Sequence, residues 1–474
     1  MNNPNPTERT LQEIETGQEN THWLAWIAEP VVIASLFSWI TLVSHAYLLP
    51  AGHWQADDYI MTGLARTAGL KGFVDRMLGW SPRPVAELIN YGYFSLVSIF
   101  NRPLIGSFLG VLWGGTYLGL ALCSWLAGIR RPLCLATLWF ALVLLMAKPG
   151  EMFFWPTGAD VYLPCWAAFA AASVLQRSTG RPLSVLFSIS LLIAAFCSEI
   201  GAVTVLLYTG LRIVGLLIKG ETRSGIIALI LPTMAALAVC LIVQIHRVQV
   251  DREIMDAGSH LAGHWIPSAI AAVPSFGREL LGIQGMPFWL AALVKLCLVL
   301  SLGGLFGESR NQRLPALLWA TALLLGAFIA IVLAFHQFGN LCCERHATLR
   351  QGMIFLAIAV FSTVLGHQAW NVRRWLLPIA VIILMAFRVD PLLHDWSIRH
   401  QIMVMRQESW HSGLSHESTM HMMVGPETRL LSSDALPPGT YHRQSRNAPG
   451  DTPWYAWGIM MLFDKDGLEI TMAH

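Results

Sequence analysis

The stretch from Leu183 to Ile218, LSVLFSISLLIAAFCSEIGAVTVLLYTGLRIVGLLI, is almost continuously apolar and decides the fold class. A helix needs about 20 apolar residues to cross a bilayer, so this run is too long for one crossing and long enough for two. We predict helices over 183–198 and 200–218, divided at the polar break Ser198-Glu199.

The whole chain of 474 residues shares this character, with 55% hydrophobic and 13% charged residues and a mean hydropathy of +0.53. Soluble proteins carry roughly 25% charged residues, so a soluble globule of this composition could not cover its surface. We predict an all-α polytopic membrane protein with about eleven transmembrane helices. They centre on residues 27–49, 103–128, 133–148, 160–176, 183–198, 200–218, 225–246, 286–306, 314–337, 350–367 and 375–390. The net charge is only +2, and the Lys and Arg residues are scattered between apolar runs. The sequence therefore has no basic surface for nucleic acid, and we expect no nucleic-acid partner.

Basic residues set the predicted orientation, because short cytoplasmic loops are enriched in Lys and Arg. Five short loops on one side are basic: Arg130/Arg131, Arg177/Arg181, Arg212/Lys219/Arg223, Arg310/Arg313 and Arg373/Arg374. We therefore expect a cytoplasmic segment at 1–26, a membrane domain over 27–390 with a long external loop at 50–102, and an external soluble tail over 391–474. Loops beyond roughly 12 to 15 residues are usually functional. The tail contains turn signals and strand-like runs such as Trp454 to Phe463.

The external loop opens with HWQADDY at residues 53–59. Two adjacent carboxylates cannot share one face of a helix, so at most one of Asp57 and Asp58 points easily into a given site. The alternative is a structural role at a helix start, where carboxylates accept backbone N–H bonds.

Further along the same loop, Gly69 to Met77 is an amphipathic segment, and WSPRP at residues 80–84 precedes a helix from Val85. Prolines on both sides of Arg83 fix the backbone around a guanidinium that suits phosphate oxygens. A surface arginine that reaches up to the membrane interface is the alternative interpretation.

A second external loop, KPGEMFFWPTGADVY at residues 148–162, combines aromatic residues with carboxylates. Its Trp155 and Tyr162 suit either an interfacial aromatic belt or a platform for a sugar or isoprenoid. Glu199 and Lys295 lie within apolar sequence, where a charge is costly and should face a wet cavity. A polar cluster able to hold an anion follows the ninth predicted span: His336, Gln337, Asn340, Glu344, Arg345, His346 and Arg350.

These motifs together resemble the GT-C superfamily of polytopic glycosyltransferases, and in particular the serotype-converting O-antigen glucosyltransferases and their uncharacterised bacterial relatives. The resemblance is carried by Asp57-Asp58-Tyr59, by Trp80 to Glu87 with its Arg-Pro, by Trp155 to Ala159 with Tyr162, and by Cys197 to Gly201. The sequence departs from the family at Pro82, where Gly more often precedes the arginine.

The resemblance implies a transferase in the bacterial inner membrane. It would move a sugar, expected to be a hexose, from a polyprenyl-phosphate donor to a cell-surface glycan, such as the O-antigen of lipopolysaccharide, or to a lipid-linked acceptor on the external leaflet. Asp57 would be the catalytic base and Asp58 its support. The expected substrate-binding residues are Tyr59, Trp80, Arg83, Trp155, Tyr162, Glu199, His336, Arg345 and His346.

No cofactor is required by this chemistry, although the paired carboxylates leave a divalent metal ion open. Two other functions stay open on the sequence. One is a non-enzymatic transporter or flippase of lipid-linked glycans, in which Glu199 and Lys295 would gate a path. The other is a ligase or polymerase that moves whole oligosaccharides.

Overall fold

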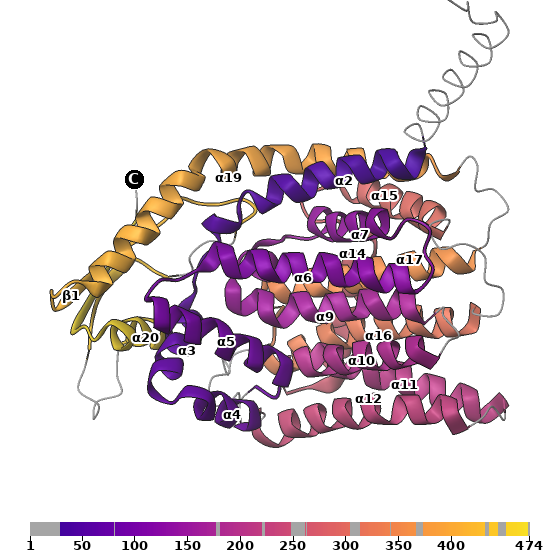
Figure 1. Cartoon of the computed structure of the whole chain (residues 1–474), viewed down its shortest axis with the longest axis horizontal. Helices are drawn as coiled ribbons and strands as arrows, with labels where there is room; N and C mark the ends of the chain where they lie inside the picture. Colours follow the sequence, from indigo (N-terminus) through magenta and orange to yellow (C-terminus); the bar gives the residue numbers. More distant parts are fainter. Residues whose placement is uncertain are drawn as a thin grey trace, which may run out of the picture.

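The computed structural model describes residues 29–79, 81–176, 181–219, 223–247, 261, 263–303, 313–341, 343–365, 373–431, 436–443 and 452–472. The predicted cytoplasmic segment 1–26 lies outside them. The described chain consists almost wholly of helices (Figure 1). Their bounds are α2 (Pro30–Ala46), η1 (Leu49–Ala51), α3 (Ala56–Thr67), α4 (Gly69–Gly79), α5 (Pro84–Phe100), α6 (Ile105–Leu126), α7 (Pro132–Met146), α8 (Gly150–Phe153), α9 (Pro156–Leu175), α10 (Arg181–Cys197), α11 (Glu199–Lys219), α12 (Arg223–Ile242), η2 (Val243–Arg247), α14 (Trp265–Leu281), α15 (Phe288–Ser301), α16 (Arg313–Phe338), α17 (Glu344–Val364), α19 (Leu376–Leu414) and α20 (Trp454–Phe463).

Each of the eleven predicted apolar segments overlaps one of these helices. Among the described residues, seven helices are long and apolar enough to cross a membrane: α6, α9, α11, α12, α16, α17 and α19. The protein is therefore a multi-pass, all-α membrane protein. The total of about eleven crossings and their orientation stay predictions.

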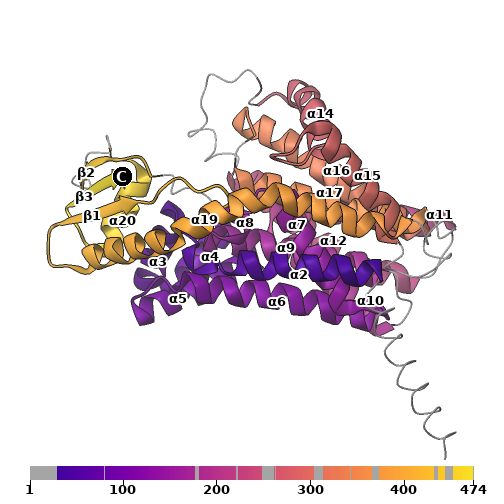
Figure 2. The ribbon, with the colours of Figure 1, turned by 90° about the horizontal axis from the view of Figure 1, so that it is seen from above.

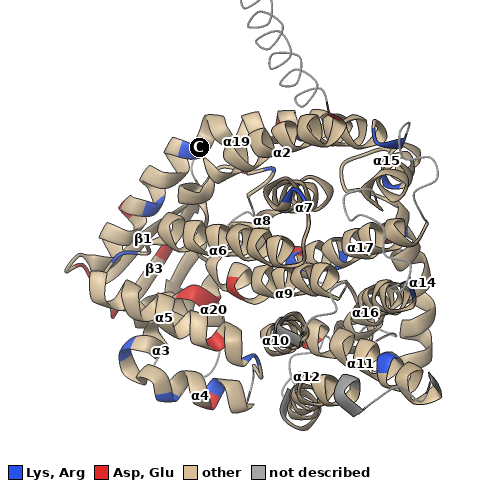
Figure 3. Cartoon of the chain, turned by 45° about the vertical axis from the view of Figure 1, so that its right-hand side comes forward, with Lys and Arg blue, Asp and Glu red and all other residues tan. Residues whose placement is uncertain are grey.

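The apolar helices run side by side along the long axis of the molecule (Figures 1 and 2). Helix α9 lies at their centre, where 89% of the residues in its most apolar 18-residue segment are buried. In α12, at the periphery, the corresponding share is only 28%. The exposed side chains of α12 are large and apolar, for example Ile227, Leu231 and Met234. Figure 3 shows few charges on these helices and many on α3, α4 and the second half of α19. A surface of this kind suits lipid on the bundle and water at that end.

The predicted external loop 50–102 folds into three helices at one end of the bundle (Figure 1). The predicted amphipathic segment is α4, and the predicted helix from Val85 is α5, which begins one residue earlier at Pro84. Proline suits this first helical position because it needs no N–H partner there. Helix α5 packs against α3, α9 and α10, so the region is part of the body of the protein.

The C-terminal region begins on the bundle, because α19 continues through the predicted boundary at residue 391 as far as Leu414. Beyond it lies a three-stranded sheet of β1 (Thr419–Val424), β2 (Gly439–His442) and β3 (Gly467–Met472). The strand order is β1-β3-β2, with β1 parallel and β2 antiparallel to β3.

The strand-like interpretation of Trp454 to Phe463 is wrong, because this segment is helix α20. A short apolar run has no period that separates a buried strand from a buried helix. Tertiary packing decides here, since α20 lies against α3. A Cβ atom on Gly458 would meet Ile60 Cγ1 at 2.5 Å, so glycine permits this close approach of the two helices.

Candidate functional site

The two adjacent acids lie in the first turn of α3, where the positive end of the helix dipole favours negative charge. They have different environments. Asp58 is fully buried, whereas Asp57 is partly exposed. The expectation that the pair cannot share one face is therefore confirmed.

Asp58 holds two helix starts together. Its Oδ2 accepts the backbone N–H of Gln55 at 2.8 Å and the indole N–H of Trp155, and its Oδ1 accepts the hydroxyl of Thr157 at 2.8 Å. Burial raises the pKa of Asp58 to about 7, against these hydrogen bonds, which lower it. The predicted alternative of a structural role at a helix start thus describes Asp58 well.

Asp57 is the carboxylate that remains available. It makes no hydrogen bond or ion pair with any residue in the described part of the chain. It lies within electrostatic range of both Asp58 and the guanidinium of Arg345. A carboxylate without a protein partner can accept a proton from a hydroxyl held next to it.

Arg83 and Glu199 form an ion pair between residues 116 positions apart in the chain. The Arg83 Nε lies 3.1 and 3.0 Å from the two carboxylate oxygens, and Nη2 lies 2.9 Å from Oε2. Burial lowers the pKa of Arg83, but Glu199 and Tyr162 outweigh burial, so the net shift is upward. The pair joins the start of α5 to the start of α11 and fixes the guanidinium in one orientation.

Tyr162 and His346 connect this ion pair to α17. The Tyr162 hydroxyl lies 2.7 Å from His346 Nε2, and its ring lies within electrostatic range of Arg83 and Arg345. His346 is the third residue of α17 and is in electrostatic range of Glu199. The Arg83–Glu199 pair, which joins the starts of α5 and α11, thus lies within electrostatic range of the Tyr162–His346 contact between α9 and α17.

Arg345 is positioned by the second aromatic loop, which forms α8 and the start of α9. Its guanidinium lies 4.8 Å from the ring centroid of Trp155, a cation–π distance. Glu151 accepts the Arg345 backbone N–H at 3.0 Å and faces the guanidinium at 3.6 Å. Because 3.6 Å is a loose ion pair, this guanidinium keeps hydrogen-bonding capacity for an anion.

Two other predicted residues, His336 and Tyr59, have partners elsewhere. His336 stacks on Trp265 of α14, with ring centroids 3.8 Å apart and 17° between the planes. Tyr59 packs edge-on against Trp54, with ring centroids 5.1 Å apart, and near Phe463 of α20. Trp80 lies outside the described residues.

Two further predicted charges have structural partners. The Lys295 ammonium donates to the backbone oxygens of Glu279 at 2.6 Å and Leu280 at 3.0 Å, at the C-terminal end of α14. Arg350 makes two bonds to the Glu279 carboxylate, at 2.8 and 2.6 Å. Cations favour the C-terminal end of a helix, so both residues stabilise the packing of α14.

Sequence reasoning missed two buried acids beside the site, Asp160 and Glu87. Neither oxygen of Asp160 has a hydrogen-bond partner in the described chain, and the side chain is 0% exposed. Asp160 lies within electrostatic range of Glu87 and Arg76, and Glu87 is 3.6 Å from Arg76. Burial raises the pKa of Glu87, and Arg76 opposes that rise. Asp160 lies in the aromatic stretch 148–162. A carboxylate in this otherwise apolar and aromatic stretch is the sequence feature that could have identified it.

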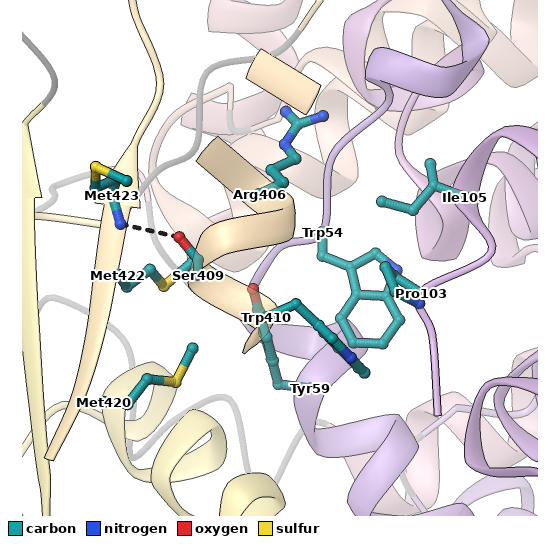
Figure 4. Close-up of a pocket in the computed structure, with 10 residues that line it drawn as sticks. All are labelled: Trp54, Tyr59, Pro103, Ile105, Arg406, Ser409, Trp410, Met420, Met422 and Met423. Carbon is teal, nitrogen blue, oxygen red and sulfur yellow. Dashed lines mark hydrogen bonds between the residues drawn. The ribbon is translucent and has the colours of Figure 1, made fainter. Parts of the chain in front are cut away.

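A small cavity separates the C-terminal region from the start of α3 (Figure 4). Its volume is about 30 Å³, which suits one or two water molecules. It is lined by Trp54, Tyr59, Pro103, Ile105, Arg406, Ser409, Trp410, Met420, Met422 and Met423. Arg406 donates to the backbone oxygens of Ala51 and Gly52, so this arginine holds η1 in place.

No three His, Cys, Asp or Glu side chains converge on a possible metal position within the described ranges. Comparison of the chain with models of protein families, with curated proteins and with solved structures finds no match.

Proposed function

We propose that the protein is a membrane glycosyltransferase that moves a hexose from a polyprenyl-phosphate donor to a glycan or lipid-linked acceptor. The observation that carries the proposal is the unpartnered carboxylate of Asp57, which lies within electrostatic range of Arg345, together with the Arg83–Glu199 pair and the Tyr162–His346 contact. The resemblance of the Asp-Asp and Arg-Pro motifs to the GT-C superfamily supports the same chemistry.

In the proposed reaction Asp57 accepts the proton of the acceptor hydroxyl. The hydroxyl oxygen then attacks the anomeric carbon of the donor sugar, and the bond from that carbon to the phosphate oxygen breaks. The electron pair leaves with the polyprenyl phosphate. A single displacement inverts the configuration at the anomeric carbon.

Two guanidinium groups would stabilise the leaving phosphate. Arg83 is fixed by Glu199, and Arg345 lies over Trp155, so neither needs to reorganise as charge develops on the phosphate. Glu199 would also bind a sugar hydroxyl, as the resemblance to the GT-C superfamily implies. The two neighbouring acids permit a divalent metal ion without requiring one.

The proposed setting is the bacterial inner membrane, with the N-terminus in the cytoplasm and both α3–α5 and the C-terminal region outside. A pathway gated by Glu199 and Lys295 is less well supported, because the Lys295 ammonium is bound to backbone oxygens at the end of α14 and holds helices together there.

The first test compares the surface glycans of cells with and without the gene, complemented by the wild type or by Asp57→Asn. The proposal predicts that one side-branch sugar is lost without the gene, returns with the wild type and stays absent with Asp57→Asn. Loss of whole glycan chains would instead indicate a ligase, polymerase or flippase. Complementation by Asp75→Asn, an exposed acid on α4, is the matched control and should be complete.

A further inference from the structure

The C-terminal region contacts the chain on both sides of Asp57, the proposed base. Before Asp57, the Trp410 ring of α19 packs edge-on against Trp54, with ring centroids 5.2 Å apart and 83° between the planes (Figure 4). After Asp57, Phe463 of α20 lies against Tyr59, with centroids 6.4 Å apart. The Trp410 and Phe463 rings also pack edge-on against each other, at 5.0 Å. Helices α19 and α20 therefore contact the start of α3 through one continuous aromatic cluster.

Helix α20 approaches α3 closely at Gly458, which faces Ile60, three residues after Asp57. Gly458 is buried, and a Cβ atom on it would lie 2.5 Å from Ile60 Cγ1 and 3.1 Å from Ile60 Cδ1. Carbon atoms in contact lie about 3.5 to 4.0 Å apart, so a methyl group at this position would push the two helices apart by about 1 Å. Isoleucine in a helix strongly prefers one χ1 rotamer, so Cγ1 cannot easily turn away.

Two further contacts hold α3 in place. Arg66, near its end, donates to the Leu462 backbone oxygen of α20 at 3.2 Å and to the Asn101 side chain at 2.9 Å. Asp58, at its start, accepts hydrogen bonds from Trp155 and Thr157 of the second aromatic stretch. Helix α3 is thus held to α9 through Asp58 and to α20 through Gly458 and Arg66.

We propose that the docking of α20 on α3 at Gly458 positions Asp57 for the transfer, so that the C-terminal region completes the catalytic site; this inference rests on the proposed function. Gly458 is then a positioning residue, because it acts through α3 and not through contact with the substrate. A displacement of 1 Å can lower the rate of an enzyme about 100-fold. The two arginines proposed to hold the donor phosphate lie at the starts of α5 and α17, so donor binding should not depend on Gly458.

The test compares Gly458→Ala with the double variant Gly458→Ala/Ile60→Ala, each in the full-length protein in phospholipid nanodiscs. Alanine favours a helix more than glycine does, so a loss in Gly458→Ala cannot come from helix propensity. The double variant removes Ile60 Cγ1 and Cδ1 and keeps Ile60 Cβ, at the ordinary contact distance of 3.9 Å. Gly63→Ala is the matched control, because a Cβ atom on Gly63 of α3 meets no atom within 4 Å.

Transfer is measured with a short-chain polyprenyl-phosphate sugar. We expect Gly458→Ala to lower kcat about 10- to 100-fold, with a KM for the donor within about twofold of the wild-type value. Gly63→Ala should match the wild type, and the double variant should recover kcat to within about threefold of it. A contact that serves stability alone would lower the folded fraction and leave kcat per folded molecule unchanged. That result, or a double variant as slow as Gly458→Ala, would overturn the proposal.

Hydrogen exchange of the α3 backbone amides, measured in the same samples, does not depend on activity. We expect exchange about tenfold faster in Gly458→Ala, because overpacking destabilises the local structure, and recovery in the double variant. Exchange at the wild-type rate in Gly458→Ala would overturn the proposal even if transfer is slow. Faster exchange with recovery, together with no transfer by the wild type, would contradict the proposed function alone and would support the control of α3 by α20.

Discussion

Charged residues gather at the end of α14 and at the start of α3, but they have bonded partners at α14 and lack them in part at α3. At α14, the Glu279 carboxylate binds Arg350, and Lys295 binds backbone oxygens. At α3, Asp57 has no partner in the described part of the chain, and buried Asp160 has none either. Native proteins leave few buried polar groups unsatisfied, and acids in such positions concentrate at functional sites. Paired charges at α14 therefore support the fold, and the unpaired acids mark the candidate site.

The largest effect is expected from Asp57→Asn, which keeps the shape of the side chain and removes its basicity. Loss of a general base typically slows a reaction about 100- to 10,000-fold. We expect transfer by purified protein to fall within this range, measured with a short-chain polyprenyl-phosphate sugar in nanodiscs.

Asp75→Asn is the matched control and should transfer at the wild-type rate. If Asp57→Asn also transfers at that rate, Asp57 is not the base. If Asp58→Asn is folded but inactive while Asp57→Asn is active, Asp58 is the catalytic base and Asp57 its support.

Arg350→Met should act on stability and leave the chemistry intact, because Arg350 is 2% exposed and bound to Glu279. Removing one partner of a buried ion pair costs about 3 to 5 kcal/mol. We expect a lower unfolding temperature and an unchanged kcat for the folded fraction. A large fall in kcat at unchanged stability would contradict the division between the two regions.

Arg83→Lys should have a smaller effect, on transfer and not on folding. Lysine keeps the charge but lacks the planar fork that meets both Glu199 oxygens and would face the phosphate. A hydrogen bond to a charged group contributes about 1.5 to 3 kcal/mol, which corresponds to a loss of roughly tenfold to a hundredfold in kcat/KM. If Arg83→Lys has wild-type kinetics, Arg83 does not bind the phosphate through its planar fork, and Arg345 alone would hold the phosphate.

An effect of pH on stability, without any substitution, is expected from the titration of Asp58, whose pKa is raised by burial. Its pKa is about 7 in the folded protein and near 4 when unfolded, so the folded state binds more protons between these values. This contribution to stability is complete below pH 4 and is lost as the pH rises through 7. We expect the unfolding temperature of the wild type to fall from pH 5 to 7 and to level off above pH 8. The same fall in Asp58→Asn, which cannot ionise, would contradict this assignment.

The sequence predicts the apolar helices well because a long apolar run has few alternatives in a membrane protein. The break at Ser198 and the helix after Pro84 lie where local signals place them. Two segments depend on tertiary packing and were not predicted. Helix α14 contains Pro267 and Pro274, which weaken a local helix signal, and α20 is helical because it packs on α3.

For the candidate site, the sequence identifies residue types but not their partners. It separates Asp57 from Asp58 by helix geometry alone, and the structure confirms their different environments. No local rule connects Arg83 with Glu199 across 116 positions, or assigns His336 to the Trp265 ring. Such contacts depend on which helices meet, and the burial of Asp160 follows from the same packing.

The configuration at the anomeric carbon of the product tests the central claim most directly. Purified wild-type protein would be incubated with a polyprenyl-phosphate hexose of known anomeric configuration and an acceptor, and the product analysed by nuclear magnetic resonance. A single displacement assisted by the unpaired Asp57 predicts transfer with inversion. Retention of configuration, or donor binding with no transfer to any acceptor offered, would contradict it.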